Sequence, residues 1–149
     1  EYLDDLKKWV DSNVDRRFVG LRREMIALLH EETQLMEIVK LIGSDVLPDD
    51  QKLTLEITRV IRVGFLQQNA FHPEDTFVPL EKQLKMLLVI SYLNEKCKEV
   101  IAQRKTIRSI IETDIFEDVI KIKYDVKNSE LEVLDGYFEK IDQALASVQ

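Results

Sequence analysis

The sequence predicts an all-α fold, a single bundle of about five to seven helices over residues 1–149. Apolar residues recur at spacings of three and four through most of the chain, which is the period of an amphipathic helix. The chain has only 4 Gly and 3 Pro, and they are expected at helix ends. Alternating apolar and polar residues are scarce, and only Val119 to Tyr124 could be mistaken for a strand.

The N-terminal third is expected to hold a short helix and a long one. The short helix is followed by a turn over 11–15, and the long helix then runs from about Arg16 to Ile42. Gly43 is a natural stop, because glycine tolerates the positive φ of many helix ends. The apolar positions of the short helix are Tyr2, Leu3, Leu6, Trp9 and Val10, and those of the long helix are Leu21, Met25, Leu28, Leu29, Leu35, Met36, Val39 and Ile42.

A polar turn over 44–50, which contains Pro48, separates the long helix from a third one. The third helix ends near Gly64, and its apolar face carries Leu53, Ile57, Val60 and Ile61. Residues 65–78 form the least regular stretch, since His72-Pro73 interrupts the helical pattern.

The C-terminal half is expected to be helical again. Pro79 suits the first turn of a helix that reaches about Arg104, and Ile107 to Lys123 forms another amphipathic segment. Ser129 and Glu132 match a capping box at the start of the last helix. The apolar positions of these two long helices are Leu80, Leu84, Leu87, Leu88, Ile90 and Leu93, then Leu131, Leu134, Phe138, Ile141 and Leu145.

Composition excludes several classes of function. A net charge of −7 argues against general attraction to nucleic acid or anionic lipid. The single cysteine, Cys97, allows no intrachain disulfide and is interpreted as an inert, buried thiol. No apolar run approaches the roughly 18 residues of a membrane span. The chain opens without Met and as though inside a helix, so it is interpreted as part of a larger protein.

No catalytic motif or metal site is predicted within the chain. There is no Gly-rich phosphate loop with Gly-Lys-Ser/Thr, so the chain alone is not a P-loop enzyme. His30-Glu31 resembles the start of a zinc-peptidase motif, but that motif requires a second His at the position of Gln34. His30 is therefore expected on a solvated helix face. The Asp49-Asp50 pair is interpreted as acidic residues at a helix start, where the dipole favours them.

The segment Phe65-Leu66-Gln67-Gln68-Asn69-Ala70-Phe71 has an unusual composition. Amide side chains stand between two aromatic residues just before the proline break. Amides both donate and accept hydrogen bonds, and an aromatic face can stack on a base. The chemistry alone leaves two interpretations open: a ligand site, or a core aromatic whose neighbouring amides cap loop backbone.

With this segment as its most specific part, the chain resembles the C-terminal domain of the catalytic A subunit of prokaryotic V/A-type ATPases. Val63-Gly64 departs from the pattern, since many members have acidic residues there, and a looser helix end is expected. The stretches that carry the resemblance are 65–71, Asp75-Thr76, Leu80 to Gln83 with Met86-Leu87, Glu37 to Gly43, Leu53 to Glu56, Lys123-Tyr124, and Tyr2 with Leu6, Trp9, Asn13 and Val14.

The resemblance implies a helical bundle that belongs to a larger catalytic subunit. That subunit would bind ATP and Mg through a P-loop outside this chain, and would couple ATP hydrolysis or synthesis to proton or sodium-ion transport. Its partners would be the central-stalk rotor subunits and the noncatalytic B subunit, in a cytoplasmic head peripheral to the membrane. The chain alone would be inactive and would bind no cofactor.

The resemblance also implies two sites within the chain. The adenine pocket would involve Phe71, Phe65, Gln68, Asn69 and Ala70. The rotor contact would be the hairpin turn with Asp45, Val46, Leu47, Pro48 and Asp49, where Val46 and Leu47 are expected to be uncovered. The alternatives are a stand-alone helical protein-interaction module and an independent helical enzyme with carboxylate chemistry.

Overall fold

The computed structural model describes residues 15–66, 80–127, 130 and 132–148, and every regular element among them is helical. This confirms the predicted all-α class. The elements are α2 (Asp15–Ile42), the 3₁₀ turn η2 (Ser44–Val46), α3 (Asp49–Arg59), the π-helix η3 (Val60–Leu66), α4 (Leu80–Ala102), α5 (Ile107–Ile111), α6 (Ile115–Ile120), α7 (Ile122–Asp125) and α8 (Glu132–Ala146).

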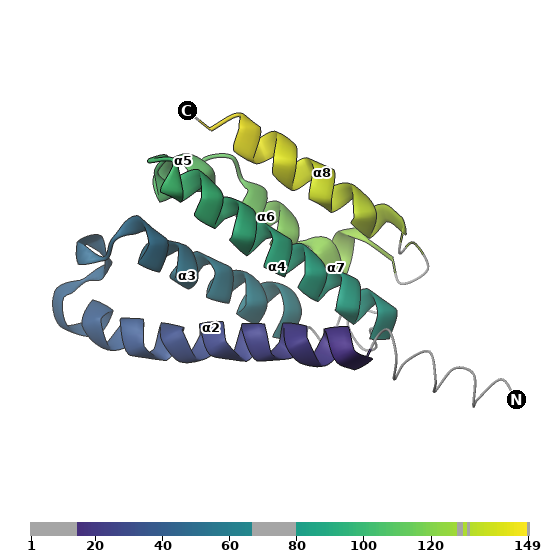
Figure 1. Ribbon diagram of the computed structural model, residues 1–149, viewed down its shortest axis with the longest axis horizontal. Helices are drawn as coiled ribbons and strands as arrows, with labels where there is room; N and C mark the ends of the chain where they lie inside the picture. The colour runs from purple at the N-terminus through teal and green to yellow at the C-terminus, as the bar shows by residue number, and fades with distance from the viewer. Residues whose placement is uncertain (1–14, 67–79, 128–129, 131, 149) are drawn as a thin grey trace, which may run out of the picture.

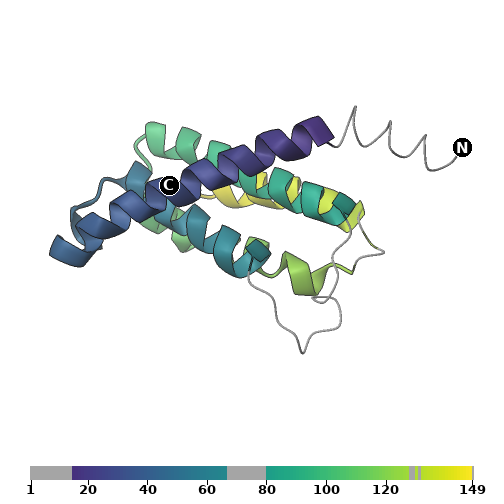
Figure 2. The ribbon, with the colours of Figure 1, turned by 90° about the horizontal axis from the view of Figure 1, so that it is seen from below.

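Helices α2 and α3 form an antiparallel hairpin along one side of the molecule (Figure 1). Helix α4 packs on both of them, and α8 covers the opposite side of α4. The short helices α5, α6 and α7 complete the bundle by packing against α3, η3 and α8 (Figure 2). The turn between α2 and α3 extends beyond the ends of the other helices (Figure 1).

The core draws apolar side chains from all of the longer helices. Ile57, Leu93, Phe116 and Ile141 are each 0–1% exposed. Burial of one such side chain stabilises the fold by about 1.5–3 kcal/mol. The predicted stripe of α2 is buried at Leu21, Met25, Leu28 and Leu35. The prediction is wrong for Ile42, which is 64% exposed, because the end of α2 lies beyond the helices that cover the rest of it.

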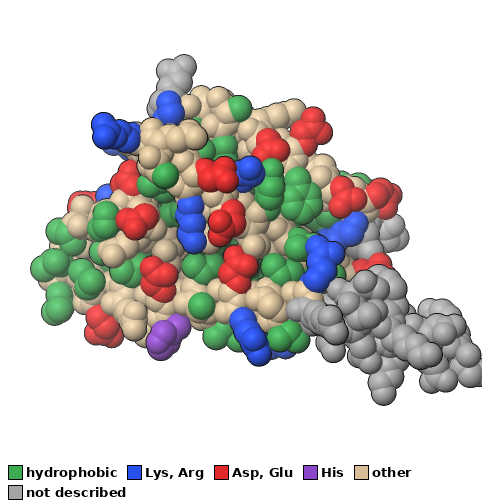
Figure 3. Space-filling view, viewed as in Figure 1, with side chains coloured by type: hydrophobic (Ala, Val, Ile, Leu, Met, Phe, Trp, Pro, Cys, Tyr) green, Lys and Arg blue, Asp and Glu red, His purple; other side chains and the backbone are tan. Residues whose placement is uncertain are grey.

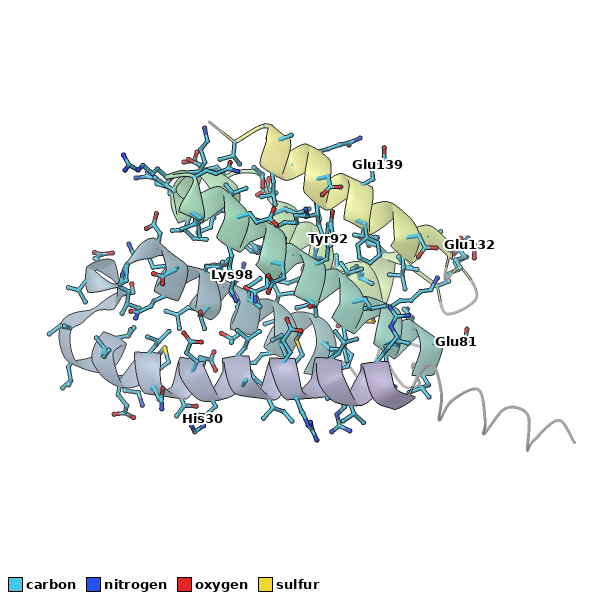
Figure 4. The ribbon with its side chains drawn as sticks, in the orientation of Figure 1. His30, Glu81, Tyr92, Lys98, Glu132 and Glu139 are labelled. Atoms are coloured by element: carbon cyan, nitrogen blue, oxygen red, sulfur yellow. The ribbon has the colours of Figure 1, made fainter. Side chains whose placement is uncertain are left out.

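Helix α8 is held on α4 by polar as well as apolar contacts. The Tyr92 hydroxyl donates to Asp142 Oδ1 at 2.6 Å, and the Tyr92 ring meets Phe138 edge-on with centroids 5.1 Å apart (Figure 4). The hydrogen bond to the carboxylate raises the pKa of Tyr92. Lys85 adds an ion pair to Asp135 at 3.2 Å.

The segment predicted as one amphipathic stretch over 107–123 is divided into three short helices. Asp114, with φ 64°, turns the chain between α5 and α6. Asp is among the residues that tolerate this left-handed conformation. Val119 to Tyr124 lies in α6, the single residue Lys121 and α7, and is not a strand, as expected.

The glycines are only partly at helix ends. Gly43 ends α2 with φ 88° and ψ 166°, a conformation nearly restricted to glycine. Gly20 and Gly136 instead lie inside α2 and α8, so that expectation is wrong for them. Asp15, expected in a turn, is the first residue of α2. The predicted first helix, the His72-Pro73 break and residues Pro79 and Ser129 lie outside the described residues.

Candidate functional site

The hairpin turn is the first of two candidate sites. After Gly43, η2 reverses the chain, and Leu47 N–H donates to Ser44 O at 3.1 Å. Val46 is 56% exposed, as expected, but Leu47 is only 5% exposed. The expectation that Leu47 is uncovered is therefore wrong, because the chain changes from the 3₁₀ turn to an extended conformation at Leu47, and this residue is buried where Val46 is not.

Asp49 is tied to another part of the bundle. It lies in the first turn of α3 with Asp50, as the helix-dipole argument predicts. Its carboxylate also accepts a hydrogen bond from the backbone N–H of Ile107 at 3.1 Å, and its side chain is half-buried. Asp49 therefore has a role inside the bundle, whereas Asp45 and Asp50 are exposed.

The projecting turn carries an exposed apolar surface, here called the tip patch. It comprises Ile38 (39% exposed), Leu41 (83%), Ile42 (64%) and Val46 (56%). Leu41 and Ile42 follow Ile38 by three and four residues, so these three side chains share a face of α2. Figure 3 shows hydrophobic side chains gathered at this end of the molecule. Sequence reasoning missed Ile38 and Leu41, although the apolar residues Ile38, Val39, Leu41 and Ile42 cover more of the helix surface than one buried stripe needs.

The second candidate site begins at Phe65. Its side chain is partly buried, packs against the core and borders a hollow of about 90 Å³. This volume is well below the roughly 300–1,000 Å³ of ligand pockets, so the hollow alone does not accommodate a nucleotide. The other lining residues are Arg22, Met25, Ile26, Leu29, Ile61 and Leu87. Gln68, Asn69, Ala70 and Phe71 lie outside the described residues.

Charged pairs fix the helical segment that leads to Phe65. Arg62 on η3 contacts Glu32 on α2, and this hydrogen bond raises the pKa of Arg62. Arg59 on α3 contacts Glu117 on α6 at 2.8 Å. Although partial burial lowers the pKa of Arg59, its contacts with Glu56 and Glu117 outweigh that effect and raise it.

The remaining candidates behave as simple structural residues. His30 is exposed and points away from the bundle (Figure 4). Cys97 is fully buried, and burial raises the pKa of its thiol to about 12. Within residues 15–66 and 80–127 and the described part of the C-terminus, no cluster of three His, Cys, Asp or Glu could hold a metal ion. None of the helices described there is long and apolar enough to cross a membrane.

The described residues form an all-α helical domain, and the sequence contains no Gly-Lys-Ser/Thr phosphate loop. A family model described as the C-terminal domain of V and A type ATP synthase matches residues 7–111. The chain belongs to this family. Helices α6, α7 and α8 lie beyond the matched range.

Similar proteins extend the match to nearly the whole chain. The V-type ATP synthase alpha chain 2 of Clostridium tetani is 45% identical over 91% of this chain and 23% of its own length. The V-type ATP synthase alpha chain of Halothermothrix orenii is 42% identical over 96% and 24%. The A subunit of the A-type ATP synthase of Methanopyrus kandleri is 37% identical over 95% and 24%. The chain therefore spans about a quarter of the length of these relatives.

Proposed function

We propose that this chain is the C-terminal domain of the catalytic A subunit of a V/A-type rotary ATPase, whose substrate is MgATP. The observation that carries the proposal is the similarity to V-type alpha chains and their A-type counterparts over more than nine tenths of this chain. The phosphates and the magnesium ion would be bound outside this chain, because its sequence has no phosphate loop. Hydrolysis or synthesis would be coupled to proton or sodium-ion transport.

The same proposal defines the partners and the location. The protein would assemble with the central-stalk rotor subunits and with the noncatalytic B subunit, in a cytoplasmic head peripheral to the membrane. The full-length protein, assembled with these partners, is expected to hydrolyse ATP in the presence of Mg²⁺. A correctly assembled complex that binds no ATP would contradict the proposal.

Within the full-length protein, residues 65–71 would form part of the adenine pocket. Phe71 would stack on the base, Phe65 would support it from the core, and Gln68, Asn69 and Ala70 would shape the loop. Phe65 packs against the core next to an apolar hollow, which suits the supporting role. Stacking of a base on an aromatic ring contributes on the order of 1–3 kcal/mol in nucleic-acid systems, and less is expected here because phosphate contacts dominate.

Substitution of Phe71 tests the pocket. In the assembled complex, Phe71→Ala is expected to weaken MgADP binding and to leave binding of inorganic tripolyphosphate unchanged, since the latter has no base. Phe18→Ala serves as the control, because Phe18 is a partly buried aromatic on the outer helix α2. Unchanged MgADP affinity in a folded Phe71→Ala complex would contradict the pocket role.

The hairpin turn would contact the central rotor shaft. Of the residues expected there, Asp45, Val46 and Pro48 are exposed, whereas Leu47 is buried and Asp49 is bonded to Ile107. The exposed residues Leu41 and Ile42 adjoin Val46 in the tip patch. The proposed contact is therefore apolar and steric more than electrostatic, because exposed ion pairs contribute only about 0–1 kcal/mol each.

A further inference from the structure

The N-terminal half of α2 has an exposed face separate from the tip patch, here called the outer face. It comprises Val19, Arg22, Arg23 and Ile26, whose spacing makes them neighbours on one side of the helix. This side is turned away from the buried stripe of α2. Val19 is 45% and Ile26 59% exposed, and both arginines are exposed. Figure 3 shows basic and apolar side chains side by side along the lower edge, between the purple histidine and the grey residues.

The outer face is basic although the whole chain is acidic. The net charge of the chain is −7, yet residues 17–30 contain three arginines and one glutamate. That glutamate, Glu24, is used within the bundle, where its carboxylate accepts a hydrogen bond from the Ser91 hydroxyl at 2.9 Å. Arg22 and Arg23 form no ion pair with any described residue. The face therefore presents two cations that the described part of the bundle does not neutralise.

The apolar hollow of about 90 Å³ lies at the edge of the outer face. Arg22 and Ile26 line it, and the exposure of Ile26 shows that the hollow is at the surface. It is smaller than the roughly 150 Å³ cavity that holds benzene, so it suits one aliphatic side chain rather than a free ligand. The η3 wall of the hollow is fixed, because a Cβ atom on the buried Gly64 would lie 3.0 Å from Ile120 Cα. Gly64 therefore fixes the helix end that sequence reasoning expected to be loose.

Gly20 borders the outer face and is exposed in the interior of α2. Among the described residues, nothing lies within 4 Å of a Cβ atom placed at Gly20. Glycine inside a helix is less favourable than alanine, and what it offers in return is space for the close approach of another backbone. Since no described segment uses that space, Gly20 is a second indication that the outer face is covered by something else.

We propose that the outer face docks against the part of the same polypeptide that precedes this chain. The docking segment would carry carboxylates that pair with Arg22 and Arg23, and one aliphatic side chain that enters the hollow. Arginine suits such a contact, because its planar guanidinium group binds a carboxylate through two parallel hydrogen bonds. The inference rests on the proposed function in one respect, which is that this chain is the C-terminal domain of a longer subunit.

Tethering favours this occupant over a separate protein. The chain spans about a quarter of the length of its relatives, and α2 is the described helix nearest to its start. A short connection gives a tethered segment an effective concentration in the millimolar range, which a separate subunit does not have. The rotor is proposed to contact the tip patch instead, and Ile42 lies about 24 Å along α2 from Ile26 at 1.5 Å per residue.

Photo-cross-linking in the full-length protein, assembled with its partners, tests the docking. The photoreactive amino acid p-benzoylphenylalanine is placed at position 26 in place of Ile26. After irradiation, the product is expected to migrate as a single subunit on a denaturing gel. Mass spectrometry is expected to find position 26 joined to a peptide from the preceding part of the same polypeptide.

Val133 is the matched control position. It is 45% exposed in the first turn of α8, which covers the side of α4 opposite α2 (Figure 1). The same photoreactive residue at position 133 should therefore join no peptide from the preceding part of the polypeptide.

Charge reversal tests the basic part of the outer face. Arg22→Glu with Arg23→Glu is expected to lower the yield of the cross-link from position 26 at least about threefold, because like charges then oppose each other across the contact. Lys121→Glu with Lys127→Glu makes the same change in net charge at two exposed lysines beside α7, and should leave the yield unchanged. Circular dichroism of each variant checks that its helices are intact.

The outcomes separate the docking from the function on which it rests. A cross-link from position 26 to a different subunit, no cross-link from it, or an equal one from position 133 would overturn the docking. An unchanged yield in the arginine variant would overturn the role of the two charges. A complex that hydrolyses ATP without the cross-link would contradict the docking alone. A complex that forms the cross-link but binds no ATP would contradict the proposed function and leave the docking intact.

Discussion

The Asp49 carboxylate and the backbone N–H of Ile107 form a hydrogen bond of 3.1 Å between residues 58 positions apart. The bond joins the first turn of α3 to the first turn of α5. Thr106 accepts from Ser109 N–H in the same turn, so two N–H groups that a helix start leaves unpaired have acceptors. The base of the projecting hairpin is thus fixed to the bundle.

Asp49→Ala is expected to lower the free energy of unfolding by about 0.5–2 kcal/mol, as for other lost helix caps. Asp50→Ala is the matched control, because Asp50 lies in the same first turn of α3 but is exposed. Loss of its helix-dipole interaction alone should cost about 0.3–1 kcal/mol. Urea unfolding followed by circular dichroism measures both. Equal destabilisation by the two substitutions would show that the bond to Ile107 contributes nothing.

The 149-residue chain is expected to fold by itself and to hydrolyse no ATP. Its helices share one apolar core, which contains residues from α2 through to α8. The sequence has no phosphate loop that could hold the transferred phosphoryl group. Far-ultraviolet circular dichroism and an ATPase assay on the purified chain check the two parts separately. A strong β signal would contradict the first, and Mg²⁺-dependent turnover that persists through purification would contradict the second.

Cys97 is expected to react with a thiol reagent at least about a hundredfold more slowly in the folded chain than in guanidinium chloride. In the folded chain, the reagent reaches the buried thiol only when the surrounding helices open locally. Burial raises its pKa from the ordinary value of 9.0 to about 12. Burial favours the neutral thiol over the thiolate. Its contribution to the free energy of unfolding is therefore complete below pH 9.0 and is lost as the pH rises towards about 12. Fast labelling of the folded chain at neutral pH would contradict the burial of Cys97.

Periodicity predicted most of the fold because the helices bury their apolar stripes against one another. The boundaries of α2 and α4 lie close to those expected, and Gly43 ends α2 as its conformational freedom predicts. The details of the candidate site depend on tertiary geometry that no local pattern encodes. Leu47 is buried and Val46 exposed because of how η2 turns the chain.

Local sequence patterns likewise could not predict which distant residues form hydrogen bonds with each other. Asp49 binds Ile107, and Lys82 binds Val126, which is 44 positions away. A lysine is ordinarily assigned to solvent, so the full burial of Lys82 had no sequence signal. Gly64 interrupts a helical pattern, and a glycine there can mark a close backbone approach. Gly64 is therefore a sequence signal for such an approach, although the sequence does not show that the approaching element is α6, at Ile120.

The tip patch, rather than the acidic residues beside it, is expected to transmit force to the rotor. Replacing Leu41, Ile42 and Val46 by Ser removes exposed apolar groups, so stability should change by less than about 0.5 kcal/mol per site. Deleting residues 46–49 is a poorer test, because it also removes the buried Leu47 and the Asp49 bond to Ile107. The control is Asp45→Asn with Asp50→Asn, which neutralises exposed acids of the same turn without changing its shape.

Single-molecule rotation of the assembled complex distinguishes the two kinds of contact. The triple Ser variant is expected to show reduced torque or looser coupling between ATP hydrolysis and rotation, because the hairpin end then presents less apolar volume to the shaft. The doubly neutralised variant should rotate with nearly wild-type torque, since each exposed charge pair contributes only about 0–1 kcal/mol and is screened by salt. Wild-type torque and coupling in the triple Ser variant would show that the tip patch is not the rotor contact. Reduced torque in the neutralised variant alone would instead assign the contact to Asp45 and Asp50.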